Sequence, residues 1–254
     1  MGFLDRFFGK KDGADDRKQS KEERWVNKQV KKVMNKYGQK EVREEAIHSL
    51  AQRGTPEAIS GLLKRFSYTH PESIIDEKEK KLVIELLEYS GAERVGEPLR
   101  SYLGEENQVS MALIAMDRIE GSDVTVTEII NVLEKASPDD VWNADKKLQM
   151  INHLDNYDNA ACVEVLLKYL EDLNDDVIFR SIDILERLGT DDQIRDAFIE
   201  LLIDEDVGNR IRDRLLQTTR SKKWFLGPQR KQLEPLLPDG YYFDKRDNLK
   251  HRNR

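Results

Sequence analysis

Among residues that could do chemistry, acidic residues are the ones that most often stand next to one another in this sequence. They occur as Asp139–Asp140, Asp175–Asp176, Asp191–Asp192 and Asp204–Glu205–Asp206. Adjacent carboxylates can serve as general acid and base or bind a metal ion. The run from Asp204 does not fit a calcium-binding loop, because Gly208 and Leu215 occupy positions that need oxygen ligands. All four groups fall where turns between helices are expected, so we interpret them as helix caps that offset the helix dipole.

The single cysteine and the histidines have no partner at the spacing of metal ligands. Cys162 lies in the apolar run AACVEVLLKYL and is expected to be a buried side chain. His153 is expected to be a half-exposed helix residue rather than a base. The phosphate-binding, dinucleotide-binding and Gly-x-Ser-x-Gly motifs do not occur in the sequence. The sequence therefore predicts no catalytic residue, no metal, no cofactor and a protein that is not an enzyme.

Charge is distributed unevenly along the 254 residues. Residues 1–40 carry a net charge of +6, residues 41–206 one of −21, and residues 207–254 one of +8. The acidic body repels nucleic-acid phosphates and anionic lipids, so such partners are expected only at the ends of the chain. No apolar run reaches the length of about 18 residues that predicts a transmembrane helix. We expect a cytoplasmic protein, with peripheral contact at the inner face of the membrane as the alternative.

A pattern of apolar residues recurs along the chain and predicts pairs of helices. After Gly54, apolar residues at offsets of +5, +8, +9 and +12 form one helical face. Before Gly54 and before Gly189, offsets of −12, −8, −7 and −4 form the face of a preceding helix. The forward pattern recurs after Gly121, Asp158 and Gly189, and after Gly91 with a shift of one residue. Such pairs must stack on their neighbours to bury both faces.

The residues between the paired helices predict a tight turn. Gly54 is expected to end the first helix in a left-handed conformation, which glycine adopts without a Cβ clash. Thr55 is expected to cap the second helix. Gly189 and Thr190 are expected to repeat these roles, and Gln193 is expected to complete a capping box.

Two stretches, EVREEAIHSLAQRGTPEAISGLL and NDDVIFRSIDILERLGTDDQIRDAFIELL, resemble HEAT-like repeats of the short type named after phycobilisome lyases. The shared pattern is an acidic turn with Val, an apolar helix that ends Leu-x-x-x-Gly, and a second apolar helix. The resemblance covers residues 41–217. It implies an all-α fold, namely an α-solenoid of about five to six two-helix repeats with capping segments over residues 21–240. The family has no shared catalytic motif, and its solenoids mostly bind proteins or peptides.

The first eight residues predict a short amphipathic helix, and residues 9–20 predict a flexible charged linker. The apolar face of residues 1–8 comprises Phe3, Leu4, Phe7 and Phe8. The basic residues beside or after this face are Arg6, Lys10 and Lys11. Such a segment would bind an anionic membrane surface weakly, dock on another protein, or fold back over the repeats.

Both ends of the repeat array are expected to be covered. The stretch ERWVNKQVKKVMNKYG predicts a capping helix whose apolar face includes Val33 and Tyr37. After a short helix that starts at Gly227–Pro228, residues 241–254 are expected to form an aromatic and then basic tail that folds back on the last repeat. The alternative is that the aromatic residues near this end stack nucleic-acid bases. They are Trp224, Phe225, Tyr241, Tyr242 and Phe243.

These features favour a non-enzymatic scaffold or adaptor. The face lined by the second helices is expected to bind a basic segment of a partner protein through exposed acids. The candidate acids are Glu128, Glu134, Glu164, Glu171 and Glu200. Two alternatives remain: a subunit of a bilin-lyase-like or other enzyme complex on a HEAT-like scaffold, and a peripheral membrane scaffold anchored by residues 1–11. Nucleic acid is not expected to be a partner of the acidic body.

Overall fold

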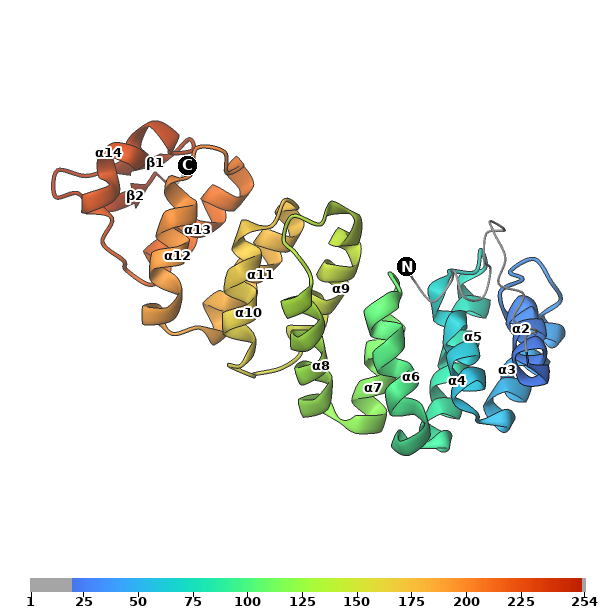
Figure 1. The fold of residues 1–254 in the computed structure, drawn as a ribbon. Helices are drawn as coiled ribbons and strands as arrows, with labels where there is room; N and C mark the ends of the chain where they lie inside the picture. Colours follow the sequence, from blue (N-terminus) through green and yellow to red (C-terminus); the bar gives the residue numbers. More distant parts are fainter. Residues whose placement is uncertain (1–19, 253–254) are drawn as a thin grey trace, which may run out of the picture. The chain divides into compact units, whose positions relative to one another are not determined.

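The computed structural model describes residues 20–252, apart from the side chain of Trp142, and these residues are mostly helical (Figure 1). They form 13 α-helices, labelled α2 to α14, and one pair of short strands. The prediction of an all-α fold is confirmed. No helix in this part of the chain is both long and apolar enough to cross a membrane. The predictions for residues 1–8, and for all of the linker except Ser20, lie outside the described residues.

The chain divides into two compact units, residues 1–132 and residues 133–254, with the boundary inside α8 (Ser122–Lys135). The described helices of unit one are α2 (Lys21–Val33), α3 (Lys40–Arg53), α4 (Pro56–Leu63), η1 (Lys64–Ser67), α5 (Ser73–Ser90), α6 (Ala92–Glu105) and α7 (Ser110–Glu120). Unit two begins with η2 (Val141–Asn143), α9 (Ala144–Leu154), α10 (Cys162–Lys168), η3 (Tyr169–Glu171), α11 (Asp175–Leu188), α12 (Asp191–Ile203) and α13 (Asn209–Ser221). It ends with η4 (Gly227–Gln229), α14 (Arg230–Leu233), η5 (Glu234–Leu236), β1 (Tyr241–Phe243) and β2 (Leu249–His251).

Within each unit, alternate helices pack against one another. In unit one, α3, α5 and α7 contact each other in turn, and so do α2, α4 and α6, so that the helices form two layers. In unit two, α9, α11 and α13 contact in turn, while α10 packs on α11 and α12 packs on α13. This packing agrees with the expected stacking of helix pairs inside each unit. A single HEAT-like solenoid over residues 21–240 stays a prediction.

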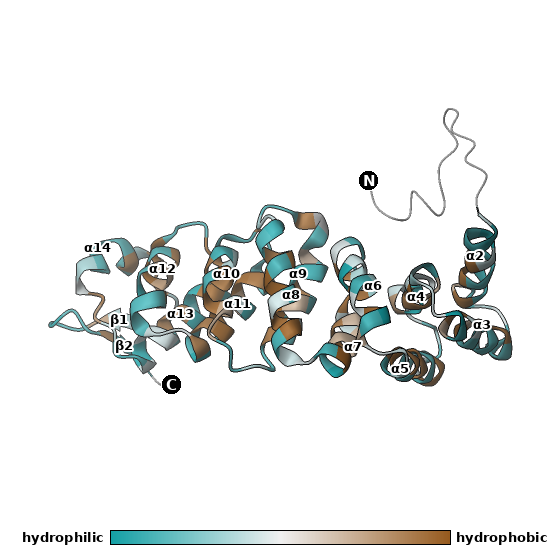
Figure 2. Cartoon of the chain, turned by 60° about the horizontal axis from the view of Figure 1, so that its bottom comes forward, coloured by the Kyte–Doolittle hydropathy of each residue, from teal (hydrophilic) through white to brown (hydrophobic). Residues whose placement is uncertain are grey.

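The apolar stripes expected from the sequence are largely buried, and Figure 2 shows apolar and polar residues segregated along the helices. All four positions after Gly54 are buried; they are Ile59, Leu62, Leu63 and Phe66. Before Gly189, all four positions are buried as well; they are Val177, Ser181, Ile182 and Leu185. Val42 is an exception, with 37% of its surface exposed, because it lies in the first turn of α3.

The two turns predicted at Gly54 and Gly189 differ in their backbone conformation. Gly54 is left-handed, with φ of +62°, and the hydroxyl of Thr55 accepts a hydrogen bond from the amide of Ala58, as expected. Gly189 has φ of −80°, so the prediction of a left-handed turn there is wrong. A Cβ at position 189 would lie 2.4 Å from Cγ2 of Ile194, so close packing, rather than handedness, requires glycine. The Gln193 side chain accepts a hydrogen bond from the amide of Thr190, as predicted.

The N-terminal cap is shorter than predicted. Ser20 accepts a hydrogen bond from the amide of Glu23 and forms a capping box, so it starts α2 rather than ending a linker. Helix α2 stops at Val33, and Tyr37 follows it with 81% of its surface exposed. The prediction that Tyr37 packs on the buried face is therefore wrong. The helix ends early because Asn35 and Gly38 form a turn, in which the Gly38 amide donates to the Asn35 carbonyl.

The C-terminal residues form a β-hairpin instead of a tail. Strands β1 and β2 pair antiparallel, with Tyr242 opposite Lys250. The carboxylate of Asp244 accepts hydrogen bonds from the amides of Arg246 and Asn248, which closes the connecting turn. Tyr241 and Phe243 are buried, whereas Tyr242 is 39% exposed. Of the leucines expected to pack inward before the hairpin, Leu233 is buried, and Leu236 and Leu237 are half-buried.

Candidate functional site

The five acids predicted to bind a partner are distributed over both units. Glu134, Glu164, Glu171 and Glu200 are exposed. Glu128, in unit one, is half-buried, and its carboxylate accepts a hydrogen bond of 2.8 Å from Nε of Arg100. The same guanidinium also pairs with Glu120 at 3.0 Å. Glu128 is therefore engaged inside unit one, whereas the other four carboxylates are accessible on unit two.

A groove in unit one lies between the start of α4 and the first half of α6. It has a volume of about 370 Å³. Its lining residues are Gly54, Pro56, Ser60, Glu93, Arg94, Glu97, Pro98 and Ser101. A smaller pocket shares Ser60, Pro98 and Ser101 with it, and extends it along the same two helices toward Tyr102 and Glu106. Both helices belong to the layer of second helices, which is the layer expected to bind a partner.

Local sequence explains the shape of this groove. The left-handed turn at Gly54 and the Thr55 cap start α4 at Pro56, so the turn itself forms one rim. Pro98 lies inside α6 and has no amide proton to donate to the carbonyl of Arg94. That carbonyl therefore loses its usual helical partner and can accept a hydrogen bond from a ligand.

Two carboxylates dominate the electrostatics of the groove. Glu93 and Glu97 are exposed, lie one helical turn apart on α6, and form no ion pair with any residue in the range 20–252. Arg94 is the one basic residue that lines the wider part of the groove. The repeat pattern could have found Glu97, because Glu97 follows Gly91 by as many residues as Glu164 follows Asp158. The neighbouring Glu93 has no counterpart among the five acids predicted to bind a partner.

The inner end of the groove is closed by buried polar contacts. Lys64 and Glu106 form an ion pair with little exposed surface. The hydroxyl of Tyr102 donates a 3.0 Å hydrogen bond to the carbonyl of Gln108. Burial, together with the negative charge of Glu106, raises the pKa of the Tyr102 hydroxyl well above its ordinary value. The ion pair joins the end of α4 to the end of α6, and the Tyr102 hydrogen bond fixes the chain just after α6, so the inner end of the groove has a defined shape.

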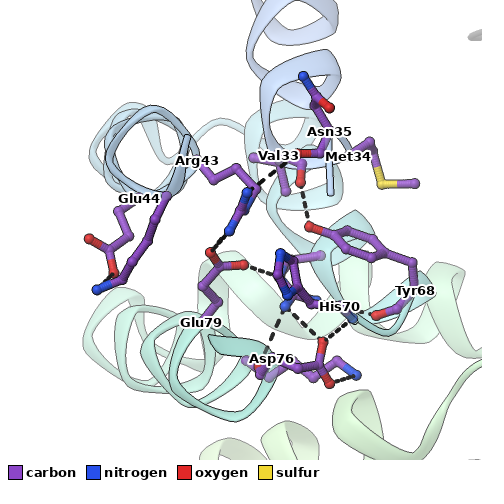
Figure 3. A network of polar contacts seen from close by, with 12 residues as sticks. Val33, Met34, Asn35, Arg43, Glu44, Tyr68, His70, Asp76 and Glu79 are labelled. Carbon is purple, nitrogen blue, oxygen red and sulfur yellow. Dashed lines mark hydrogen bonds and ion pairs between the residues drawn. The ribbon is translucent and has the colours of Figure 1, made fainter. Parts of the chain in front are cut away.

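A second polar cluster in unit one lies between the two layers and connects α3, η1 and α5 (Figure 3). Glu79 is fully buried, and its carboxylate accepts bonds from Arg43 at 2.9 Å and from Arg65 at 2.8 Å. Both arginines are buried as well, with 1% and 0% of their surface exposed. Arg65 also pairs with Asp76 at 2.8 Å, and its guanidinium stacks 4.4 Å from the ring centre of Tyr68.

The remaining contacts of this cluster fix the chain between η1 and α5. The amide of His70 donates a 2.8 Å hydrogen bond to Asp76, and Nδ1 of His70 accepts one of 3.0 Å from the amide of Glu72. The hydroxyl of Tyr68 donates a 2.7 Å hydrogen bond to the carbonyl of Val33. The cluster is thus a structural clamp. The sequence pattern missed it because residues that bond to each other lie up to 36 residues apart.

The clamp predicts a specific dependence of stability on pH. Burial opposes the ionisation of Asp76, but bonds from Lys80, the His70 amide and Arg65 outweigh it and hold the pKa of Asp76 below its ordinary value. A carboxyl with a depressed folded pKa stabilises the protein above its unfolded pKa, about 3.9, and loses this contribution as pH falls through the folded pKa. We expect Asp76→Asn to lower the free energy of unfolding at neutral pH.

The same variant should lose stability less steeply than wild type on acidification below about pH 4. Urea unfolding followed by circular dichroism at neutral and acidic pH measures both effects. Asp139→Asn, at an exposed turn position, is the control and should leave both unchanged. If the free energy of unfolding of Asp76→Asn fell as steeply with decreasing pH as that of wild type, this would contradict the assigned role of Asp76.

In unit two, the cysteine, the histidine and the aspartates that were considered as catalytic or metal-binding residues make structural contacts. Cys162 is buried, as predicted, and burial raises the pKa of its thiol. His153 is half-buried, as expected, and its Nε2 lies 2.9 Å from the hydroxyl of Tyr157. Asp175 and Asp191 lie in the first turns of α11 and α12, where their charges offset the helix dipole as expected, but the prediction that these acids cap the helices is wrong, because the caps are Asn174 and Thr190. Asp191 also accepts a 3.0 Å hydrogen bond from the indole of Trp224.

Comparison of the chain with protein-family models, with curated proteins and with solved structures found no match. The fold defines the class of protein only as an all-α protein with two compact helical units. Its kinship to HEAT-like repeats rests on the sequence pattern and remains a proposal.

Proposed function

We propose that this protein is a non-enzymatic scaffold of the HEAT-like type that binds a basic segment of a partner protein in the groove between α4 and α6. The observation that carries the proposal is the pair of accessible carboxylates, Glu93 and Glu97, above a floor that contains the buried Pro98, with the exposed Pro56 at the rim. Exposed acids without internal partners attract cationic groups over a distance of about 10 Å at ordinary salt. An apolar floor favours a ligand that also carries an apolar side chain.

The geometry of the groove selects a ligand conformation. Residues one helical turn apart have Cβ atoms about 5–6 Å from each other. In an extended peptide, alternate residues lie about 7 Å apart and point to the same side. An extended segment with basic residues at alternate positions therefore matches Glu93 and Glu97. The carbonyl of Arg94, freed by Pro98, can accept a hydrogen bond from the backbone of such a segment.

A charge-reversed variant tests this proposal. The probe is a fluorescein-labelled extended peptide that alternates lysine with leucine and serine, and its binding to the full chain is followed by fluorescence anisotropy. We expect Glu93→Lys/Glu97→Lys to weaken binding about tenfold at low salt, because two attractions become repulsions. The difference should shrink as salt screens the charges.

The matched control is Asp192→Lys/Asp196→Lys, which changes the net charge equally at two exposed positions one helical turn apart on α12 of unit two. It should weaken binding much less than the groove variant. Equal weakening by both double variants would mean that the peptide responds to net charge alone, and the groove would no longer be assigned as the binding site.

The other functions considered from the sequence stay predictions. The apolar residues Phe3, Leu4, Phe7 and Phe8 lie outside the described residues, so their contact with lipid or protein remains a prediction. The same holds for a peripheral membrane scaffold anchored by residues 1–11, for a cytoplasmic location, and for a role as a subunit of an enzyme complex.

A further inference from the structure

We infer that the C-terminal part of unit two binds single-stranded nucleic acid, in a groove between the end of α13 and the β-hairpin. This groove has a volume of about 330 Å³. It is lined by Thr219, Arg220, Lys223, Trp224, Phe225, Asn248, Leu249 and Lys250. The two lining segments are distant in sequence. They meet where the side chain of Tyr241, at the start of the hairpin, interacts with Asp213 and Arg220 of α13.

The groove gathers three cations that have no carboxylate within ion-pair distance among the described residues, although the charge of Lys250 acts on Asp244. Arg220, Lys223 and Lys250 are exposed, and none of them forms an ion pair with another residue of the described range 20–252. Nearby basic residues differ in this respect, since Lys222 pairs with Asp191 at 2.9 Å and Arg230 pairs with Glu234 at 3.1 Å. The unpaired cations concentrate positive potential at one place on the surface, where phosphate groups can bind.

Exposed aromatic rings lie beside these cations. Phe225 lines the groove with 51% of its surface exposed. Tyr242 is 39% exposed and lies opposite Lys250 in the hairpin, so both side chains project from the same face. The guanidinium of Arg252 lies 5.0 Å from the ring centre of Tyr242. Nucleic-acid bases stack on exposed rings of this kind, whereas an acidic peptide needs only the cations. The rings therefore favour nucleic acid.

The aromatic residues are held in place by the end of α13. The Trp224 ring packs edge-on against Phe198, with ring centres 6.2 Å apart, and its indole N–H donates to Asp191. The amide of Trp224 donates a 2.9 Å hydrogen bond to the carbonyl of Thr219, which closes the helix. Phe225 follows directly, so its exposed ring is attached to a fixed support.

Lys223 has a strained backbone. Its φ is +57°, in the left-handed region, at the position after a helix where glycine is usual. A lysine at such a position persists although glycine would relieve the strain, and strained residues cluster at functional sites. Lys223 also lines the groove, so its cationic side chain is available to bind a ligand there.

The test uses the full chain and a fluorescein-labelled oligothymidylate of about 12 nucleotides, followed by fluorescence anisotropy. Three cations that each contact a phosphate predict a slope of about −2 in a plot of log K against log salt for single strands. Phe225→Ala should weaken binding roughly tenfold, through the loss of one stacked base. Lys250→Gln should weaken binding and reduce the magnitude of the slope by about 0.7.

The variant Lys223→Gly distinguishes a loss of binding from a loss of stability. It removes one cation and relieves the left-handed strain, so it should weaken binding while the melting temperature stays the same or rises by about 2 °C. The controls are Tyr89→Ala, which removes a 93% exposed ring in unit one, and Lys231→Gln, which removes an exposed cation from α14. Neither control should change binding by more than about twofold.

Two results would overturn the inference. One is binding to the oligonucleotide that Phe225→Ala and Lys223→Gly weaken no more than the two controls do. The other is displacement of the oligonucleotide by a polyglutamate peptide of equal charge, together with no effect of Phe225→Ala, because the groove would then be specific for an acidic protein segment. Neither result bears on the acidic groove of unit one, which the basic peptide tests separately.

Discussion

Glu79→Ala is expected to destabilise unit one by about 3–5 kcal/mol, because it leaves two buried arginines without the carboxylate that they share. Arg43 and Arg65 have 1% and 0% of their surface exposed and both bond to Glu79. Their guanidinium groups cannot lose their protons, so the charges stay buried and poorly compensated. A loss of this size is comparable to the whole stability of many domains. Urea unfolding followed by circular dichroism measures it.

Glu44→Ala is the matched control for this experiment. Glu44 pairs with Lys40 at 3.2 Å on the surface of α3, with about a third of its side chain exposed, and exposed pairs of this kind contribute about 0.5 kcal/mol. If Glu79→Ala unfolded at the same urea concentration as Glu44→Ala, Glu79 would not be the shared partner of the two buried arginines.

Leu185→Asp is expected to destabilise unit two to a similar extent. Leu185 is fully buried on α11, which packs against α9, α10 and α13. A carboxylate at this position would have no partner, and burying such a group costs several kcal/mol in addition to the apolar contacts that are lost. Because α11 contacts three other helices, we expect the loss of helical signal on heating to exceed that of one helix. Thermal melting followed by circular dichroism measures it.

Leu173→Asp provides the comparison for Leu185→Asp. Leu173 lies just before α11 and is 63% exposed, so the same change of side chain should have little effect on the melting temperature. A melting curve of Leu185→Asp that matched wild type would show that Leu185 does not pack in the core of unit two.

Features that depend on neighbouring residues were predictable from the sequence. The turn at Gly54 and Thr55 was predicted correctly, because handedness and helix capping are set by residues within one helical turn. The buried stripe from Val177 to Leu185 was also predicted, since a period of 3.6 residues places these side chains on one face. The same reasoning failed at Gly189. This position requires glycine because a Cβ would clash with Ile194, and not because the backbone is left-handed.

The sequence by itself thus determined that the chain is all-α, most of the residues that face the core in the helix pairs around Gly54 and Gly189, and that the positive charge lies at its ends. Tertiary structure alone decided which distant residues meet. It brings Arg43 and Arg65 to Glu79, joins Pro56 and Glu97 in one groove, and sets Lys250 beside Phe225. Periodicity and capping act over a few residues, whereas these contacts depend on how helices and a hairpin pack, and no short-range pattern encodes that packing.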